Sequence, residues 1–205
     1  MVRIKAIINV VLFATATMLV NTAVSQHESE DNFPAFMVIN GCEIKPGTVC
    51  KKADLRNADL RHVLLSNADL SGADMRGVDL ARADIRHINL RGADLRGANL
   101  ESVQAQAAFL QGAKLDKANL HGADLNFARL SGAHLVDANL RSANLEAAWL
   151  PKADLTRANL KNANLQEAKF YNANFLNAEL DGARIHYAIF QDAFMDGCDA
   201  CPHDW

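Results

Sequence analysis

The sequence lacks the features that usually identify an enzyme or a nucleic-acid-binding protein. Its 205 residues hold no recognisable Ser/His/Asp grouping, phosphate-binding loop or pair of carboxylates in a cleft, which argues against catalysis. Positive charge is also scarce, because 21 Lys and Arg stand against 24 Asp and Glu for a formal net charge of −3. We therefore expect neither a basic surface nor a nucleic-acid partner, and we expect no cofactor.

Threonine is scarce as well, and the histidines follow no regular spacing. Beyond residue 25 the only threonines are Thr48 and Thr156, so the ordered threonine ranks of flat ice-binding surfaces are absent. The seven histidines share no common spacing, so no metal array is visible; they are His27, His62, His87, His121, His134, His186 and His203.

What the sequence does contain is one uninterrupted repeat. From residue 53 to residue 197 it can be divided into 29 consecutive pentads, beginning Ala-Asp-Leu-Arg-Asn and Ala-Asp-Leu-Arg-His. Leu occupies the third place, here called the centre, in 21 of the 29 pentads, and Ala occupies the first place in 25. A repeat held this long predicts a stacked architecture in which each unit contacts only its neighbours.

The order of residues within a pentad predicts a very short strand followed by a corner. The Ala and the centre are two residues apart and both apolar, which is the spacing of side chains on one side of a strand. The residue between them is Asp or Asn in 17 pentads and must point outward. Nine of the 11 glycines lie at the fifth place, where a tight turn needs positive φ. A chain that turns every five residues with the same side inward must coil.

These tandem A(D/N)LXX motifs resemble the pentapeptide-repeat family, and the resemblance covers 145 of the 205 residues. It implies an all-β fold, a right-handed quadrilateral parallel β-helix of about seven coils that is capped at both ends. Stacked Leu and Ala would fill the interior. At a strand spacing of ~4.8 Å, the rod would be roughly 35 Å long.

The first 25 residues are typical of a secretory signal peptide. Arg3 and Lys5 precede an apolar run over residues 6–20, and Ala23-Val24-Ser25 forms a small-residue cleavage site. A membrane anchor is the alternative, although the run is short for a span. Cleavage would remove both positive charges and leave a net charge of −5. We expect export to the periplasm or the medium, or to the thylakoid lumen if the chain is cyanobacterial, with no membrane span in the mature protein.

The next segment is expected to cover the open first coil, whose core side chains and strand edges need a cap. Residues 26–32 are polar and acidic, and residues 33–39 are apolar. Pro34 could start a short helix that Asn40-Gly41 ends, but a strand fits equally well. The predicted organisation is a signal peptide over 1–25, a tail and cap over 26–52, the repeat domain over 53–197 and a C-terminal cap over 198–205.

Four cysteines lie at the two ends of the repeat, and they allow three pairings. On a rod of the expected length the ends are roughly 35 Å apart, whereas bridged Cα atoms lie within about 7 Å. This predicts the disulfides Cys42–Cys50 and Cys198–Cys201, which an oxidising compartment favours. Two alternatives stay open for the C-terminal pair: a zinc site completed by His203 and Asp204, or a redox pair.

The repeat has two kinds of irregularity in its core places. Ala105 occupies a centre and Val103 the preceding Ala place, which predicts a local bulge or an underpacked coil. Phe170 and Phe190 are twenty residues apart, so they should stack on one side of the interior.

Charged residues recur every twenty residues on one face. Asp54, Asp74 and Asp94 form one column, and Arg56, Arg76 and Arg96 form another beside it. Like charges at strand spacing repel each other, so we expect the two columns to neutralise each other on a solvated face. An ion-binding ladder is the less favoured interpretation.

One corner departs from this polar pattern. Phe109 and Trp149 should share a column about 10 Å apart, with Arg129 between them in reach of both rings. Exposed aromatic patches mark interaction sites, although scattered surface aromatics are equally compatible with these residues. The candidate interaction patch consists of Phe109, Phe127, Arg129, Trp149, Tyr187 and Ile189, together with Ala107 and Ala147.

The sequence therefore predicts an exported, non-enzymatic protein-binding or scaffold module, whose partner is another protein or a second copy. Some members of the family resemble DNA and inhibit gyrase. The expected signal peptide, the modest charge and the arginine column disfavour that role here. A zinc or redox site at Cys198 and Cys201 is the remaining alternative.

Overall fold

The computed structural model describes residues 36–202, and the predicted signal peptide lies outside them. The described chain begins with a hairpin of two strands, β1 (Met37–Ile39) and β2 (Cys42–Ile44), paired antiparallel. Asn40 and Gly41 connect them with φ values of 48° and 82°, as a two-residue type I′ turn requires. Of the two alternatives for this cap, the strand is therefore correct over residues 37–39, while Pro34 lies outside the described residues.

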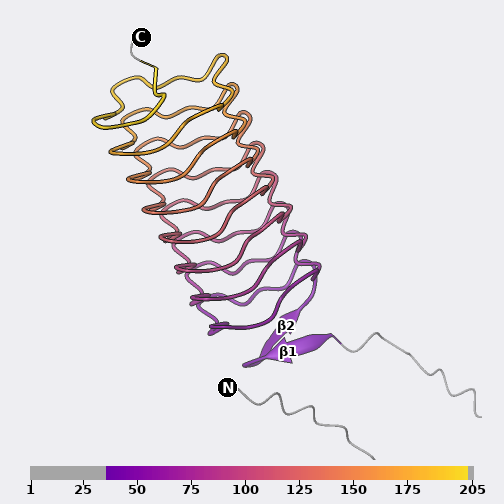
Figure 1. Cartoon of the computed structure of the whole chain (residues 1–205). Coiled ribbons are helices and arrows are strands. Elements are labelled where there is room, and N and C mark those ends of the chain that lie inside the picture. The colour runs from indigo at the N-terminus through magenta and orange to yellow at the C-terminus, as the bar shows by residue number, and fades with distance from the viewer. Residues whose placement is uncertain (1–35, 203–205) are drawn as a thin grey trace, which may run out of the picture. The chain divides into compact units, whose positions relative to one another are not determined.

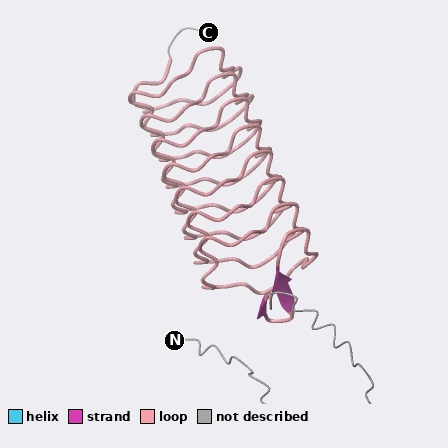
Figure 2. Ribbon diagram, turned by 90° about the vertical axis from the view of Figure 1, so that its right-hand side faces the viewer, coloured by secondary structure: helices cyan, strands magenta, loops and turns pink. Residues whose placement is uncertain are grey.

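The rest of the described chain is a four-sided parallel β-helix with twenty residues per coil (Figure 1). Each outward residue between the Ala and the centre pairs in parallel with the residue twenty positions later, as Asp54 pairs with Asp74. The strand of each pentad is this single bridged residue, so the coils are drawn as loops in Figure 2. Both neighbouring coils supply backbone hydrogen bonds, for example from the Leu55 N–H to the Asp74 carbonyl at 2.8 Å.

The coil extends slightly beyond the uninterrupted repeat. Pairing begins at Val49, one pentad before residue 53, and ends at Asp199, which pairs with Glu179. Thr48-Val49-Cys50 thus acts as a pentad of altered sequence, with Thr48 buried in the place of Ala. Cys198-Asp199-Ala200 is the corresponding altered pentad at the other end.

A tight turn closes every pentad. The centre carbonyl accepts a hydrogen bond from the backbone N–H three residues later, as from Ala58 to Leu55 at 3.2 Å. The fifth place lies between them with positive φ, as expected for a type II turn. At Gly77 a Cβ would in addition lie 2.5 Å from Oδ1 of Asn57, so the Asn57 side chain would have to move. Twenty fifth places between 57 and 197 are nevertheless not Gly, so the fold tolerates an unfavourable conformation repeatedly.

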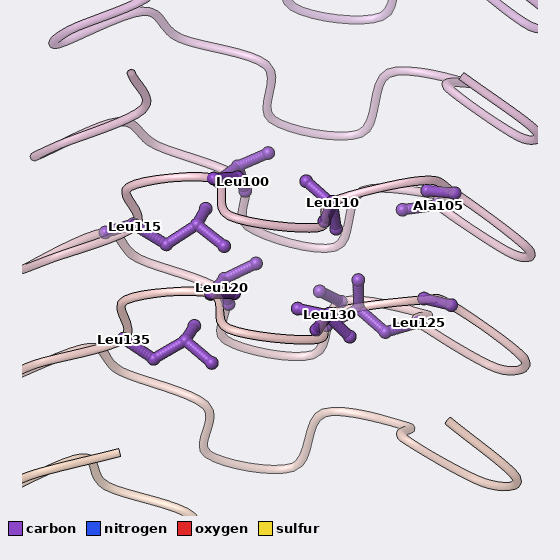
Figure 3. Close-up of a cluster of buried hydrophobic side chains, with 14 of the residues drawn as sticks. Leu100, Ala105, Leu110, Leu115, Leu120, Leu125, Leu130 and Leu135 are labelled. Atoms are coloured by element: carbon purple, nitrogen blue, oxygen red, sulfur yellow. The ribbon is translucent and has the colours of Figure 1, made fainter. Parts of the chain in front are cut away.

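The centres form stacked columns in a dry interior. All of them from Leu55 to Leu180 are buried, with exposures of 3% or less. Figure 3 shows Leu100 over Leu120, Leu110 over Leu130 and Leu115 over Leu135. Phe170 and Phe190 stack with ring centres 4.9 Å apart, which confirms the prediction from their spacing.

Ala105 lies above Leu125 in one of these columns and carries the smallest side chain of any centre (Figure 3). Of the two alternatives predicted here, a local bulge or an underpacked coil, the bulge is wrong. The backbone stays in register, because the Gln104 N–H bonds the Ala83 carbonyl at 2.9 Å and the Ala105 N–H bonds the Asp124 carbonyl at 2.8 Å. Hydrogen bonds to both adjacent coils hold this segment in line whatever its side chain.

Both predicted cysteine pairs are joined in the structure, Cys42 to Cys50 and Cys198 to Cys201, each with Cα atoms 5.7 Å apart. The first pair ties β2 to the first coil, and Cys50 is partly buried against the core. Between residues 36 and 202 there is no free cysteine and no cluster of three potential metal ligands. His203 and Asp204, which the zinc alternative requires, lie outside this range. The same range contains no helix suited to crossing a membrane.

Candidate functional site: an aromatic and cationic groove

One column of outward residues carries most of the candidate patch. In successive coils it contains Asn89, Phe109, Arg129 and Trp149, each paired in parallel with the next. Phe109 and Trp149 are therefore two coils apart with Arg129 between them, as the twenty-residue spacing predicts.

A shallow open groove of about 720 Å³ lies over this column. We call it the aromatic groove. It is lined by His87, Ala107, Phe109, Gln111, Phe127, Arg129, Ser131, Ala147 and Trp149. These residues come from four successive coils and from three neighbouring columns, so the site depends on the stacking of coils.

Alternating small and large side chains at the fifth place give the groove its shape. Ala107, Phe127 and Ala147 follow one another in that column, so a bulky ring stands between two methyl groups. Phe127 is 63% exposed and has a φ of 57°. Positive φ is rare for a bulky residue and costs roughly 1–2 kcal/mol. Nothing in the core of the rod requires a ring at this place.

Phe109 lies between two guanidinium groups. Its ring centre is 4.4 Å from Cζ of Arg91 and 5.3 Å from Cζ of Arg129, both within cation–π distance. The side chain is half-buried rather than fully outward. The predicted bridging of both rings by Arg129 is wrong, since among the described residues the ring contact of Trp149 is with Tyr171, at 5.8 Å.

Arg91 and Tyr171 were missed from the sequence, although each lies beside its partner once the chain is written in rows of twenty. Arg91 lies one row before Phe109 and two places further along the row. Tyr171 lies one row after Trp149 and is also two places further along. The register contained this signal, but the predicted patch covered only the columns of Phe109 and Phe127, whereas Arg91 and Tyr171 lie in the next column.

Two buried amide oxygens at the corners of the same coil have no hydrogen-bond partner among the described residues, Oε1 of Gln106 and Oε1 of Gln111. Leaving such an acceptor unsatisfied costs about 1–3 kcal/mol. Gln106 still donates through Nε2 to Asp124 at 2.6 Å. Gln111 lines the groove, but this oxygen is itself enclosed by protein atoms.

The charge of the groove differs from that of the charged columns on another face. There Arg56 donates two hydrogen bonds to Asp54, at 2.8 and 2.7 Å, and Arg76 and Arg96 do the same with their own aspartates. The predicted neutralisation of the two columns is confirmed. The guanidinium of Arg56 lowers the pKa of Asp54 to about 2. In contrast, no carboxylate between residues 36 and 202 pairs with Arg91 or Arg129 within 4.0 Å.

Two members of the candidate patch lie away from the groove. Ile189 follows Trp149 by two coils in the same column, with Lys169 between them, and it is half-buried. Tyr187 is 70% exposed, and its ring lies against that of His186 with centres 3.7 Å apart. The structure thus brings together Phe109, Phe127, Arg129 and Trp149 and leaves Tyr187 and Ile189 near the C-terminal end.

A four-sided parallel coil of five-residue steps defines a class of repeat protein, and comparison with protein-family models identifies it. The model described as "Pentapeptide repeats (8 copies)" matches residues 47–82, 79–115, 106–141, 138–175 and 163–199. Because these matches together span more than half of the chain, the protein belongs to the pentapeptide-repeat family, and its fold is the right-handed quadrilateral β-helix.

Solved structures of the same family are similar to it. HetL of Nostoc sp. strain PCC 7120, described as involved in heterocyst differentiation regulation, is 29% identical over 76% of this chain and 88% of its own, with a TM-score of 0.27. Rfr23 of Cyanothece 51142 is 22% identical over 74% and 90%, with a TM-score of 0.37. QnrB1, a plasmid-mediated fluoroquinolone resistance protein, is 16% identical over 76% and 84%, with a TM-score of 0.46. A comparison with curated protein sequences finds no match.

Proposed function

We propose that this chain is an exported, non-enzymatic pentapeptide-repeat protein that binds a partner protein through the aromatic groove. The observation that carries the proposal is Phe127, an exposed ring held at unfavourable φ beside the exposed ring of Trp149. Buried aromatic anchors supply most of the affinity in many protein interfaces, whereas an exposed ring gives the free rod nothing. The partner is a different protein or a second copy of this chain.

Export is supported by the signal-like composition of residues 1–25 and by the two cysteine pairs, since structural disulfides persist in oxidising compartments. A DNA-mimic role is not favoured, because the aspartates on the charged columns are neutralised by Arg56, Arg76 and Arg96. A zinc role is less favoured, because the pairing of Cys198 with Cys201 leaves no free thiolate there. A redox role is less favoured, because no helix begins at this pair in the part of the chain that the structure describes.

The test uses a variant that removes two rings without touching the core, Phe127→Gly with Trp149→Ser. We expect it to stay folded and to lose the partner that the wild-type protein captures by cross-linking in the exported fraction, or to lose self-association in analytical ultracentrifugation. Lys117→Gly is the control, because Lys117 is an exposed fifth-place residue with a φ of 58° outside the groove. If the folded double variant captures the same proteins as the wild type and has the same oligomeric state in ultracentrifugation, the groove is not the binding site.

A further inference from the structure

We propose that the aromatic groove receives an extended acidic segment of the partner, anchored by one aromatic or large apolar side chain. This inference rests on the proposed function of the groove as a protein-binding site. It specifies the chemistry of the segment from two observations: cations that pair with no carboxylate, and exposed rings beside small residues.

The charges favour an acidic partner. The lining residues include no carboxylate, and Arg91 adds a second guanidinium at the ring of Phe109. Most arginines before residue 100 instead hold a neighbouring aspartate, for example Arg86 with Asp84 at 2.7 Å. The groove thus holds the Arg129 cation, and beside it Arg91 donates to the neutral side chain of Asn89 at 3.0 Å, on a chain whose net charge is negative. The N–H donors along the edge of a guanidinium are well suited to binding carboxylates while its face lies on a ring.

The rings of the groove favour an apolar anchor between the carboxylates of the partner segment. Ala107 and Ala147 flank Phe127 in its column, and Trp149 is 46% exposed. A ring of the partner placed over either alanine would contact Phe127 on one side. Burial of such a side chain contributes about 1.5–3 kcal/mol, which is the scale of a hot spot.

The dimensions agree with a short segment. Both guanidinium groups lie over the single ring of Phe109, so they are no more than about 10 Å apart, which three to four residues of extended chain span at ~3.3 Å each. The groove extends over Phe109 to Trp149, two coils, which is also about 10 Å. A motif of acidic, aromatic and acidic residues fits this length.

The probe is a dye-labelled peptide of sequence Glu-Ser-Glu-Glu-Phe-Glu-Glu-Ser-Glu, titrated with the full-length protein by fluorescence anisotropy. Matched peptides replace every Glu with Gln, or replace the Phe with Ser. We expect the acidic Phe peptide to bind at least about tenfold more tightly than either, and to weaken as salt is raised.

The protein variants separate the groove from general charge effects. Arg91→Gln with Arg129→Gln should weaken binding of the acidic peptide at least about tenfold and leave the Gln peptide unchanged. Arg141→Gln is the control, since Arg141 is exposed on another face and pairs with no carboxylate among residues 36–202. It should bind the acidic peptide as the wild type does.

The outcomes distinguish this inference from the proposed function. If the peptides bind equally, or if Arg141→Gln weakens binding as much as the groove variant, acidic recognition is wrong. If no peptide binds while the Phe127→Gly, Trp149→Ser variant still loses its captured partner, the groove binds protein of a different chemistry and this inference fails alone. If a neutral oligosaccharide such as chitohexaose binds the groove and no protein does, both proposals fail.

Discussion

Arg56 and Asp54 are held side by side on the surface of the first coil, with Nε donating to Oδ1 at 2.8 Å and Nη2 to Oδ2 at 2.7 Å. The same two-pronged contact joins Arg61 to Asp59 at 2.8 and 2.6 Å. Paired charges of this kind make the stability of the N-terminal coils depend on pH, in a direction that follows from the aspartate pKa values.

Stability should fall in acid. The hydrogen bonds from Arg56 and Arg61 lower the pKa values of Asp54 and Asp59 to about 2, below the unfolded value near 3.9. Protons then bind the unfolded chain more tightly, so the contribution is complete above about pH 4 and is lost as pH falls through about 2. Because these pairs are exposed, the effect should be modest and should shrink at high salt.

The measurement is the thermal unfolding midpoint between about pH 5 and pH 2 in low and high salt. Asp54→Asn with Asp59→Asn should have a flatter pH profile than the wild type. An unchanged profile in this variant would mean that other groups cause the acid loss.

A charge in the interior should prevent folding. Leu120 is 1% exposed and lies in a dry column, so Leu120→Asp buries a carboxylate with no partner, at a cost of several kcal/mol. We expect loss of cooperative unfolding by circular dichroism. Arg141→Asp places the same group on the surface and should unfold nearly as the wild type does, and cooperative wild-type-like unfolding of Leu120→Asp would overturn the inward assignment of the centre.

Removing an exposed ring should stabilise the rod. Phe127→Gly relieves positive φ, and after the entropy cost of Gly we expect a gain of about 0.5–1 kcal/mol in urea unfolding. Lys117→Gly should give a similar gain, since its φ is 58°. A loss of stability for Phe127→Gly alone would show that the ring packs on the rod, which contradicts its proposed role.

Each disulfide should stabilise its own end. Cys42→Ser with Cys50→Ser should lower stability by about 2–3 kcal/mol, because the bridge closes a short loop between the hairpin and the first coil. Peptide mapping under non-reducing conditions should find 42–50 and 198–201 linked. Stoichiometric zinc in the full-length protein, together with free thiols at 198 and 201, would instead support the metal alternative.

The inward side of the repeat could be predicted from one apolar pattern, and the four-sided coil followed from the resemblance to the pentapeptide-repeat family. A period of five with Ala and Leu two places apart leaves one inward side, and this gave the buried columns of Leu120 and Phe170 without ambiguity. The altered pentad at Val49 was predicted only in part. The register placed Cys50 at a centre, five residues before Leu55, but Thr48 and Val49 were assigned to the cap because Thr48 and Cys50 replace the usual Ala and Leu. Of the two alternatives predicted at Ala105, the bulge is wrong, because backbone hydrogen bonds from both adjacent coils keep this segment in register.

The candidate site was predicted less completely. The shared column of Phe109 and Trp149 followed from register alone. Which cation covers which ring depends on side-chain rotamers and on neighbouring columns, so Arg91 and Tyr171 were missed. The unsatisfied oxygen of Gln111 has no sequence signature, because any glutamine at a corner looks alike until its surroundings are known.

The twenty-residue coil also determines which genetic changes the groove can survive. Duplicating a full coil, for instance residues 108–127, would lengthen the groove and keep every column intact, since the pairing interval is unchanged. Deleting one pentad between Phe109 and Trp149 would instead rotate the remaining chain by one side of the square and move the two rings to adjacent faces. The surface of such a rod can therefore evolve in length by whole coils while its recognition pattern is preserved.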